Sequence, residues 1–510
     1  MHRKLLAVAI AASLAGAAFA GPRYGCAGNN GGPHQTNEPE QTVGLGSWAT
    51  DAIITVGDEG SQTDPNGSVG TDVNFEKFGY RFPGIPDGMG AFPLNKKTVR
   101  MVVNHEFRSA QGYPYRLANG AELTGARVSY FDIDRNNRKV TGMGLAYDAI
   151  YNRAGDEVGS PSDLIGGGLN RLCSANLFEA GEFGLEDTIF FTGEETGGGT
   201  EWALDVAAHD LWAAPMMGLA AWESVTLLEN FDSNKVVALI GDDRGGAPLL
   251  LYVGEKGAEP ASGPYKPSDF LIRNGLGLGN LYVWVADNGD LSPADFNQTG
   301  DSRDGRFVKI MHFAPSNANA PGWDELGFAD QDTQDALADA VGKFAFSRPE
   351  DVATNPDNGT QAVMASTGRS SLFPDDKWGT TYLVDVDLES EKLSLDLDDA
   401  GLDEIAANVK ILYAGDDCGS GNGSVGGVGD CAGGQFSDPD FGLRSPDNLD
   451  WADDGFIYLQ EDRSYGEFGD TSGEEASIWR MDPQDGLLTR IAQMDRSALP
   501  TGQEDIDPTD

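Results

Sequence analysis

Several carboxylates in this chain follow short runs of β-forming residues and stand beside glycine, asparagine or arginine. Each alone is more typical of a turn that closes a strand. If several strand ends gather around one axis, however, the carboxylates repel one another unless a cation offsets their charge. Oxygen ligands suit Ca²⁺, whereas a thiolate indicates a transition metal. The candidates are Glu106 in VVNHEF, Glu195 in TGEE, Asp243 in IGDDR, Glu350 in SRPED and Asp447 in SPDN.

The stretch FSRPEDVATN places Arg348 beside Glu350 and Asp351. One interpretation is a salt-bridged turn, in which the guanidinium is only an ion-pair partner. The other is a bidentate contact to a phosphate group, helped by nearby cations. In an extended segment, Asp351 points away from the face that carries Glu350. The stretch alone leaves both interpretations open.

Other catalytic arrangements find little support in the sequence. Beyond the first 20 residues the histidines are His34, His105, His209 and His312, and none form an H-x-x-x-H pair. The chain also lacks a G-x-S-x-G elbow, which argues against two common hydrolase designs. A Ser-His-Asp triad assembles in space and is neither excluded nor favoured by spacing.

Four cysteines follow the first 20 residues. Cys418 and Cys431 bracket a glycine-rich loop and are expected to form a disulfide in an oxidising compartment. Cys26 and Cys173 could also pair. If Cys173 is free, it needs another role.

The charge balance is strongly acidic, with 35 Lys and Arg against 81 Asp and Glu and a net charge of -46. Nucleic acid is therefore excluded as a natural partner, because phosphate backbones require clustered Lys and Arg. An acidic surface also maintains solubility, and a salty medium or many bound hard cations would suit it.

The N-terminus resembles a secretory signal peptide. Residues 1–20 combine a basic start, an apolar run and an A-x-A cleavage site before Gly21, without a twin arginine. No later apolar run approaches the roughly 18 residues that a membrane span needs. We therefore expect a Sec-exported, periplasmic or secreted protein without a membrane span, in which residues 21–510 form one monomeric domain.

Short alternating segments separated by Asp, Gly and Asn turns predict an all-β fold. Candidate hairpin units fall near residues 97–150, 185–210, 234–256, 280–312, 348–390 and 441–490. Their irregular spacing favours a divergent six-bladed β-propeller-like fold with long inserts. Two segments, 333–345 and 402–410, have apolar residues at helical spacing and are predicted to be helices.

The order of these motifs resembles the PhoX-type alkaline phosphatases. The series is VVNHEF, RLCSAN, TGEE, IGDDR, SRPEDVATNP, and SPDNL followed by GFIYLQED, across residues 100 to 465. The resemblance implies a six-bladed propeller-like fold that carries ferric and calcium ions. It also implies hydrolysis of small phosphate monoesters outside the cytoplasm.

Site roles follow from the resemblance. Cys173 matches a thiolate ligand of the iron pair, and Arg348 matches the phosphate-binding arginine. Glu195, Glu350 and Asp447 match carboxylate ligands of the metals. Glu106 and Asp243 are added as further candidate ligands, Asp243 in place of a glutamate that the family has after its GDD stretch. Here that stretch continues with Ala247 and Pro248.

Two further departures concern the thiolate and the export route. An inserted NLFEAGEFGLED separates Cys173 from the Glu pair. The family is typically exported folded, through a twin-arginine signal, whereas this leader is of the Sec type. A disulfide between Cys26 and Cys173 would remove the thiolate ligand of iron and leave calcium as the only expected metal. The alternatives are a Ca²⁺-dependent propeller hydrolase, such as a phosphodiesterase or lactonase, and a non-catalytic, Ca²⁺-stabilised secreted propeller.

Overall fold

A computed structural model describes residues 36, 40–57, 80–388, 404–416, 442–462, 476–495 and 498. The predicted signal peptide and the cysteines at positions 26, 418 and 431 lie outside these residues. Within them, no helix is long and apolar enough to cross a membrane.

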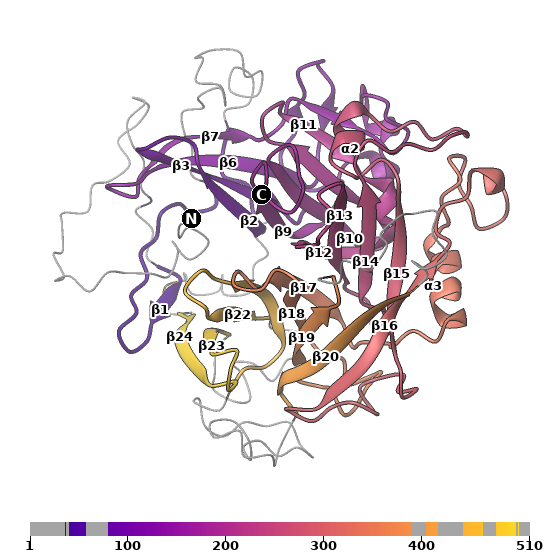
Figure 1. The fold of residues 1–510 in the computed structure, drawn as a ribbon. Helices are drawn as coiled ribbons and strands as arrows, with labels where there is room; N and C mark the ends of the chain where they lie inside the picture. Colours follow the sequence, from indigo (N-terminus) through magenta and orange to yellow (C-terminus); the bar gives the residue numbers. More distant parts are fainter. Residues whose placement is uncertain are drawn as a thin grey trace.

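The described chain consists mainly of β-strands, which confirms the all-β prediction (Figure 1). Four strands near the N-terminus form one sheet: β2 (Pro86–Pro93), β3 (Thr98–His105), β6 (Arg127–Asp134) and β7 (Val140–Leu145). Five strands from both ends of the chain form another: β1 (Thr42–Gly44), β24 (Leu488–Met494), β23 (Ser477–Met481), β22 (Ile457–Glu461) and β21 (Pro446–Trp451). β4 (Tyr115–Arg116) pairs with β5 (Glu122–Leu123).

The remaining strands form one path of hydrogen-bonded neighbours, the thirteen-stranded sheet. One half of this path is β17 (Pro349–Thr354), β18 (Gln361–Ser366), β19 (Thr380–Val386), β20 (Glu404–Ala414), β16 (Ser302–Ile310) and β15 (Gly279–Ala286). The other half is β14 (Leu250–Glu255), β13 (Lys235–Asp242), β12 (Leu219–Leu228), β10 (Ile189–Asp205), β11 (Asp210–Ala213) and β8 (Ala149–Tyr151), with β9 (Leu172–Phe178) paired to β10. The six-bladed arrangement stays a prediction, because these pairings do not divide the strands into six separate sheets.

The two helix predictions have different outcomes. Helix α3 (Gln331–Ala340) covers much of the predicted 333–345 segment, and the Asp330 carboxylate caps it by accepting from Thr333 N at 2.9 Å. The prediction for 402–410 is wrong, since the described part of this segment, residues 404–410, belongs to strand β20. Its apolar residues alternate along the strand, with Ile405 and Ala407 buried and Glu404 and Ala406 exposed. This alternation has the two-residue period of a strand, and in a segment this short it also fits a helical spacing. Helix α2 (Asp269–Arg273) was not predicted.

One local irregularity recurs in five strands: β2, β9, β12, β17 and β21. In each of these five bulge strands, the four residues from one paired position to the next lie opposite only three residues of the partner strand, so the bulge adds one residue. Such bulges bend a strand and turn a side chain out of its regular alternation. The bulges begin at Pro86, Leu172, Trp222, Pro349 and Pro446.

The bulge strands lie beside one another in chain order: β2 by β9, β9 by β12, β12 by β17, and β17 by β21. Buried polar contacts join them. The Asn176 side chain on β9 donates to Ser224 Oγ at 2.9 Å on β12 and to Val352 O at 3.2 Å on β17. The Asp351 carboxylate on β17 accepts from Leu449 N on β21 at 2.9 Å. The ends of distant segments are thereby held together.

Close backbone approach between strands requires glycine at position 241 of β13. A Cβ there would lie 2.0 Å from the carbonyl oxygen of Glu350 on β17. We predict that Gly241→Ala forces β13 and β17 apart and lowers the free energy of unfolding by about 2–3 kcal/mol. Urea unfolding measures this change.

The matched control is Gly159→Ala. Gly159 is exposed, and the nearest atom to a Cβ there is Asp163 Oδ2 at 3.8 Å. This variant should unfold within about 0.5 kcal/mol of the parent protein. Equal stability of the two variants would contradict the close approach of β13 to β17.

Candidate metal centre

The five bulges place one potential metal ligand each at the same point of the fold. In every case the ligand is the second residue of the bulge, directly after the residue at which the bulge begins. All five belong to groups whose ligand atoms lie within 4.8 Å of one another. These bulge ligands are Asp87, Cys173, Glu223, Glu350 and Asp447.

The strands paired with the bulge strands supply a second set of ligands. Here the ligand directly follows the residue opposite the start of the bulge, so it leaves the partner strand at the same level. Glu106 follows His105, Glu195 follows Glu194, and Asp243 follows Asp242. All three ligands belong to the same close groups as the bulge ligands. The structure therefore brings together every metal-ligand candidate named from the sequence.

Three residues of this centre were missed by sequence reasoning: Asp87, Glu223 and Arg171. A signal existed for two of them. Asp87 follows a proline at a strand start, as Glu350 and Asp447 do. Glu223 is the only carboxylate in β12, a strand whose ten residues are all buried. Arg171 carried no signal of its own beside the cysteine motif.

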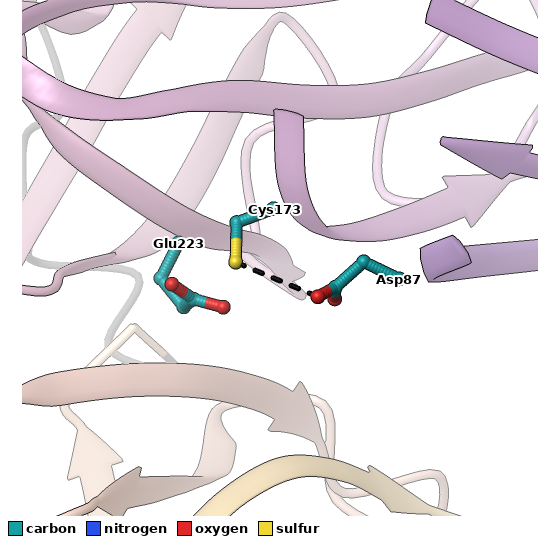
Figure 2. Close-up of side chains that lie close together, drawn as sticks. All are labelled: Asp87, Cys173 and Glu223. Atoms are coloured by element: carbon teal, nitrogen blue, oxygen red, sulfur yellow. Dashed lines mark hydrogen bonds between the residues drawn. The ribbon is translucent and has the colours of Figure 1, made fainter. Parts of the chain in front are cut away.

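Cys173 lies among carboxylates and is a free, buried thiol (Figure 2). Its Sγ is 3.7 Å from Asp87 Oδ2, and Glu223 extends toward the same space. Burial, followed by the charges of Asp87 and Glu223, raises the pKa of the Cys173 thiol well above its ordinary value. A thiolate at this position therefore requires a nearby positive charge.

Arg348 joins ligands from two strands. Its Nε and Nη2 donate to the two oxygens of Asp243, at 2.6 and 2.8 Å, and Nη2 lies 3.0 Å from Glu350 Oε1. Burial acts to raise the pKa of Asp243, but the hydrogen bonds and charge of Arg348 outweigh it and lower that pKa. The Thr367 hydroxyl also donates to Glu350 Oε1 at 2.6 Å. The carboxylates are thus held in place by neutral and charged donors.

Arg171 binds a different pair of ligands in the same way. Its Nε donates to Glu106 Oε1 at 2.7 Å, and its Nη2 contacts Glu195 Oε2. Two guanidinium groups therefore face seven carboxylates and one thiol. This imbalance leaves a large excess of potential negative charge.

The excess appears as strongly raised pKa values. Burial is the main cause for Glu223, Glu350 and Asp447, and neighbouring carboxylates add to it. Burial and Glu106 raise the pKa of Asp87 to about 7. Buried anions at such distances ionise together only when cations offset their charge. The donors fit bound metal, with oxygen ligands for hard cations and one thiol for a softer one.

Neighbouring polar residues support the centre without joining the ligand groups. Asp351 accepts from Val352 N and Leu449 N, both at 2.9 Å, and belongs to none of the ligand groups. Asn448 Nδ2 donates to Asp87 Oδ1 at 3.1 Å and links β21 to β2. His105 contacts Gly84 O and Ser129 Oγ instead, and burial lowers its pKa to about 3.

Comparison with known proteins finds similar structures but no similar sequence. No protein-family model matches the chain, and no curated protein matches its sequence. The structure is similar to that of Pseudomonas fluorescens PhoX in complex with vanadate, a transition state analogue. The TM-score is 0.55 and the identity 18%, over 87% of this chain and 85% of that one. The chain has a PhoX-like fold. At this identity the likeness to PhoX shows the fold alone.

A structural genomics protein of unknown function from Bacteroides thetaiotaomicron also matches. Its TM-score is 0.25 and its identity 10%, over 81% of this chain and 70% of that one. A likeness at this level carries no argument.

The raised pKa values predict how the metal-free protein responds to pH. Burial and Asp243 raise the pKa of Glu195 to about 9, and that of Asp87 is about 7. The folded state therefore keeps protons that the unfolded chain releases near pH 4. Since the folded state binds more protons in this window, its free energy of unfolding falls as pH rises from about 4 to about 9.

Urea unfolding of chelator-treated protein at several pH values measures this fall. Excess Ca²⁺ should reduce it, because bound cations stabilise the ionised carboxylates. Metal-free protein that is more stable at about pH 9 than at about pH 5 would contradict this electrostatic account of the centre.

Proposed function

We propose that this protein is a metal-dependent phosphatase that hydrolyses small phosphate monoesters, as a PhoX-like alkaline phosphatase. The observation that carries the proposal is the grouping of a free thiol, seven carboxylates and Arg348 at one point of a PhoX-like fold. The similar structure holds vanadate, described as a transition state analogue. The six-bladed propeller-like arrangement and the single domain over residues 21–510 belong to the same proposal.

The proposed cofactors are Fe(III) and Ca²⁺. Cys173, with Asp87, Glu106 and Glu195, would hold iron, because these residues, like Glu223, share groups with the thiol. Glu223, Glu350 and Asp447 form an oxygen-only group that suits calcium, and Asp243 closes a further group with Glu195 and Glu223. When bound, such cations polarise phosphoryl oxygens and make water more acidic.

Arg348 is the proposed phosphate-binding residue. Its Nε and Nη2 are held by Asp243, which fixes the plane of the guanidinium. Among the described residues, no hydrogen bond or ion pair involves Nη1. This N–H group can therefore donate a hydrogen bond to a phosphoryl oxygen. A fixed guanidinium costs little reorganisation when negative charge develops on the transferred group. Thr367 keeps Glu350 aligned beside it.

Several parts of this proposal concern the whole protein. We propose small phosphorylated substrates, no nucleic-acid partner, and a monomer. A Sec-type leader cleaved near Ala20 would direct the protein to the periplasm or the medium.

Hydrolysis of p-nitrophenyl phosphate tests the function. Metal-loaded protein should release p-nitrophenol, and prolonged chelation should abolish this activity. Arg348→Ala should lower kcat/KM by about 10²- to 10³-fold, because a preorganised donor to the transition state is lost. Arg348→Lys should recover little, since lysine cannot reproduce the two-point contact to Asp243.

Arg303→Ala is the matched control. Arg303 has the same side-chain exposure as Arg348, 20%, and its Nε likewise lies 2.6 Å from an aspartate, Asp290. Activity of this variant should stay within about twofold of the parent protein. Unchanged activity of Arg348→Ala would contradict its assignment. Activity that depends on Ca²⁺ but is unaffected in Cys173→Ser would favour a calcium-only hydrolase.

A further inference from the structure

Arg369 differs from three other arginines near the metal centre. Arg171, Arg244 and Arg348 each bind two carboxylates; Arg244 binds Asp242 and Asp335. The guanidinium of Arg369 makes no hydrogen bond or ion pair within the described part of the chain, and the residue is exposed. With 81 acidic and 35 basic residues in the chain, an unpaired guanidinium in this place requires a reason.

The Arg369 side chain packs against a residue close in sequence to a metal-ligand candidate. A Cβ on Gly245 would lie 2.8 Å from Arg369 Cδ and 3.3 Å from its Nε. Gly245 comes two residues after Asp243, and Arg369 comes two residues after Thr367, whose hydroxyl binds Glu350. The Arg369 side chain therefore lies against the segment that follows β13, two residues beyond Asp243.

The turn that carries Arg369 is held by the backbone. Arg369 N donates to Asp376 O at 2.9 Å, and Arg369 O accepts from Leu372 N and Phe373 N, at 3.0 and 2.8 Å. The same turn places Leu372 Cδ2 3.2 Å from a Cβ on Gly245, and Leu372 exposes 48% of its surface. A cationic group and an apolar group thus stand side by side at the edge of the metal centre.

We infer that Arg369 is a specificity-determining residue that binds a second anionic group on the alcohol part of the phosphate ester. This inference rests on the proposed phosphatase function. The metals and Arg348 would hold the transferred phosphoryl group, so the alcohol part would extend past Gly245 toward Arg369 and Leu372. An acidic protein repels a second anion unless a local cation offsets that repulsion. The favoured substrates are phosphate esters that carry another phosphate or a carboxylate.

Kinetics on matched substrate pairs test the inference. Fructose 1,6-bisphosphate is compared with fructose 6-phosphate, and 3-phosphoglycerate with glycerol 3-phosphate. In Arg369→Ala, KM for the substrates with a second anion should rise about fivefold, with kcat nearly unchanged, since an exposed charge pair contributes to binding alone. The kinetic constants for fructose 6-phosphate and glycerol 3-phosphate, which lack a second anion, should stay within about twofold of the parent protein.

Two further variants separate binding from a structural effect. Arg369→Lys should recover most of the loss, because it restores the charge. Arg135→Ala removes an exposed arginine from the turn between β6 and β7, and it should change none of the constants. Raised salt should reduce the preference for the second anion in the parent protein but not in Arg369→Ala.

The outcomes are distinct. A loss with both doubly anionic substrates supports binding of anions in general, and a loss with the bisphosphate alone supports binding of a second phosphate. Unchanged ratios between the paired substrates in Arg369→Ala would overturn the inference while leaving the phosphatase function intact. Metal-loaded parent protein that hydrolyses none of these esters, nor p-nitrophenyl phosphate, would overturn both.

Discussion

Repulsion between buried carboxylates is the constraint on which this structure depends. Seven carboxylates and a thiol lie in overlapping groups of close ligand atoms, and among the described residues only Arg171 and Arg348 form ion pairs with them. Without further cations the folded state keeps protons on several of these groups, at a cost in stability that grows as pH rises from about 4 to about 9. Bound metals remove that cost, so folding and the proposed chemistry depend on the same ions.

The fold meets this constraint with one device used five times. Each bulge strand directs its second bulge residue to the centre, and three partner strands add a carboxylate at the same level. Hydrogen bonds that Asn176 and Asn448 donate and that Asp351 accepts then join the bulge strands to one another. Because every ligand sits on a strand or directly after the last residue of one, the centre is held by the sheets themselves.

Sequence reasoning reached much of this centre through short acidic motifs. It named six ligand candidates that the structure brings together, from these motifs and from the resemblance of their order to the PhoX-type family. It missed Glu223 because a single glutamate within the apolar strand β12 looks like an ordinary residue until its neighbours are known. It also took 402–410 for a helix, since short segments with buried isoleucine and valine fit either period. Strand pairing across the sheets, which decides both cases, is not visible in local sequence.

Elemental analysis of freshly purified, desalted protein tests the central claim most directly. The account predicts that iron and calcium remain bound, and that Cys173→Ser loses iron while calcium is retained, since only the groups around the thiol favour a softer ion. A folded protein that retains neither metal, with all its carboxylates in place, would contradict the account.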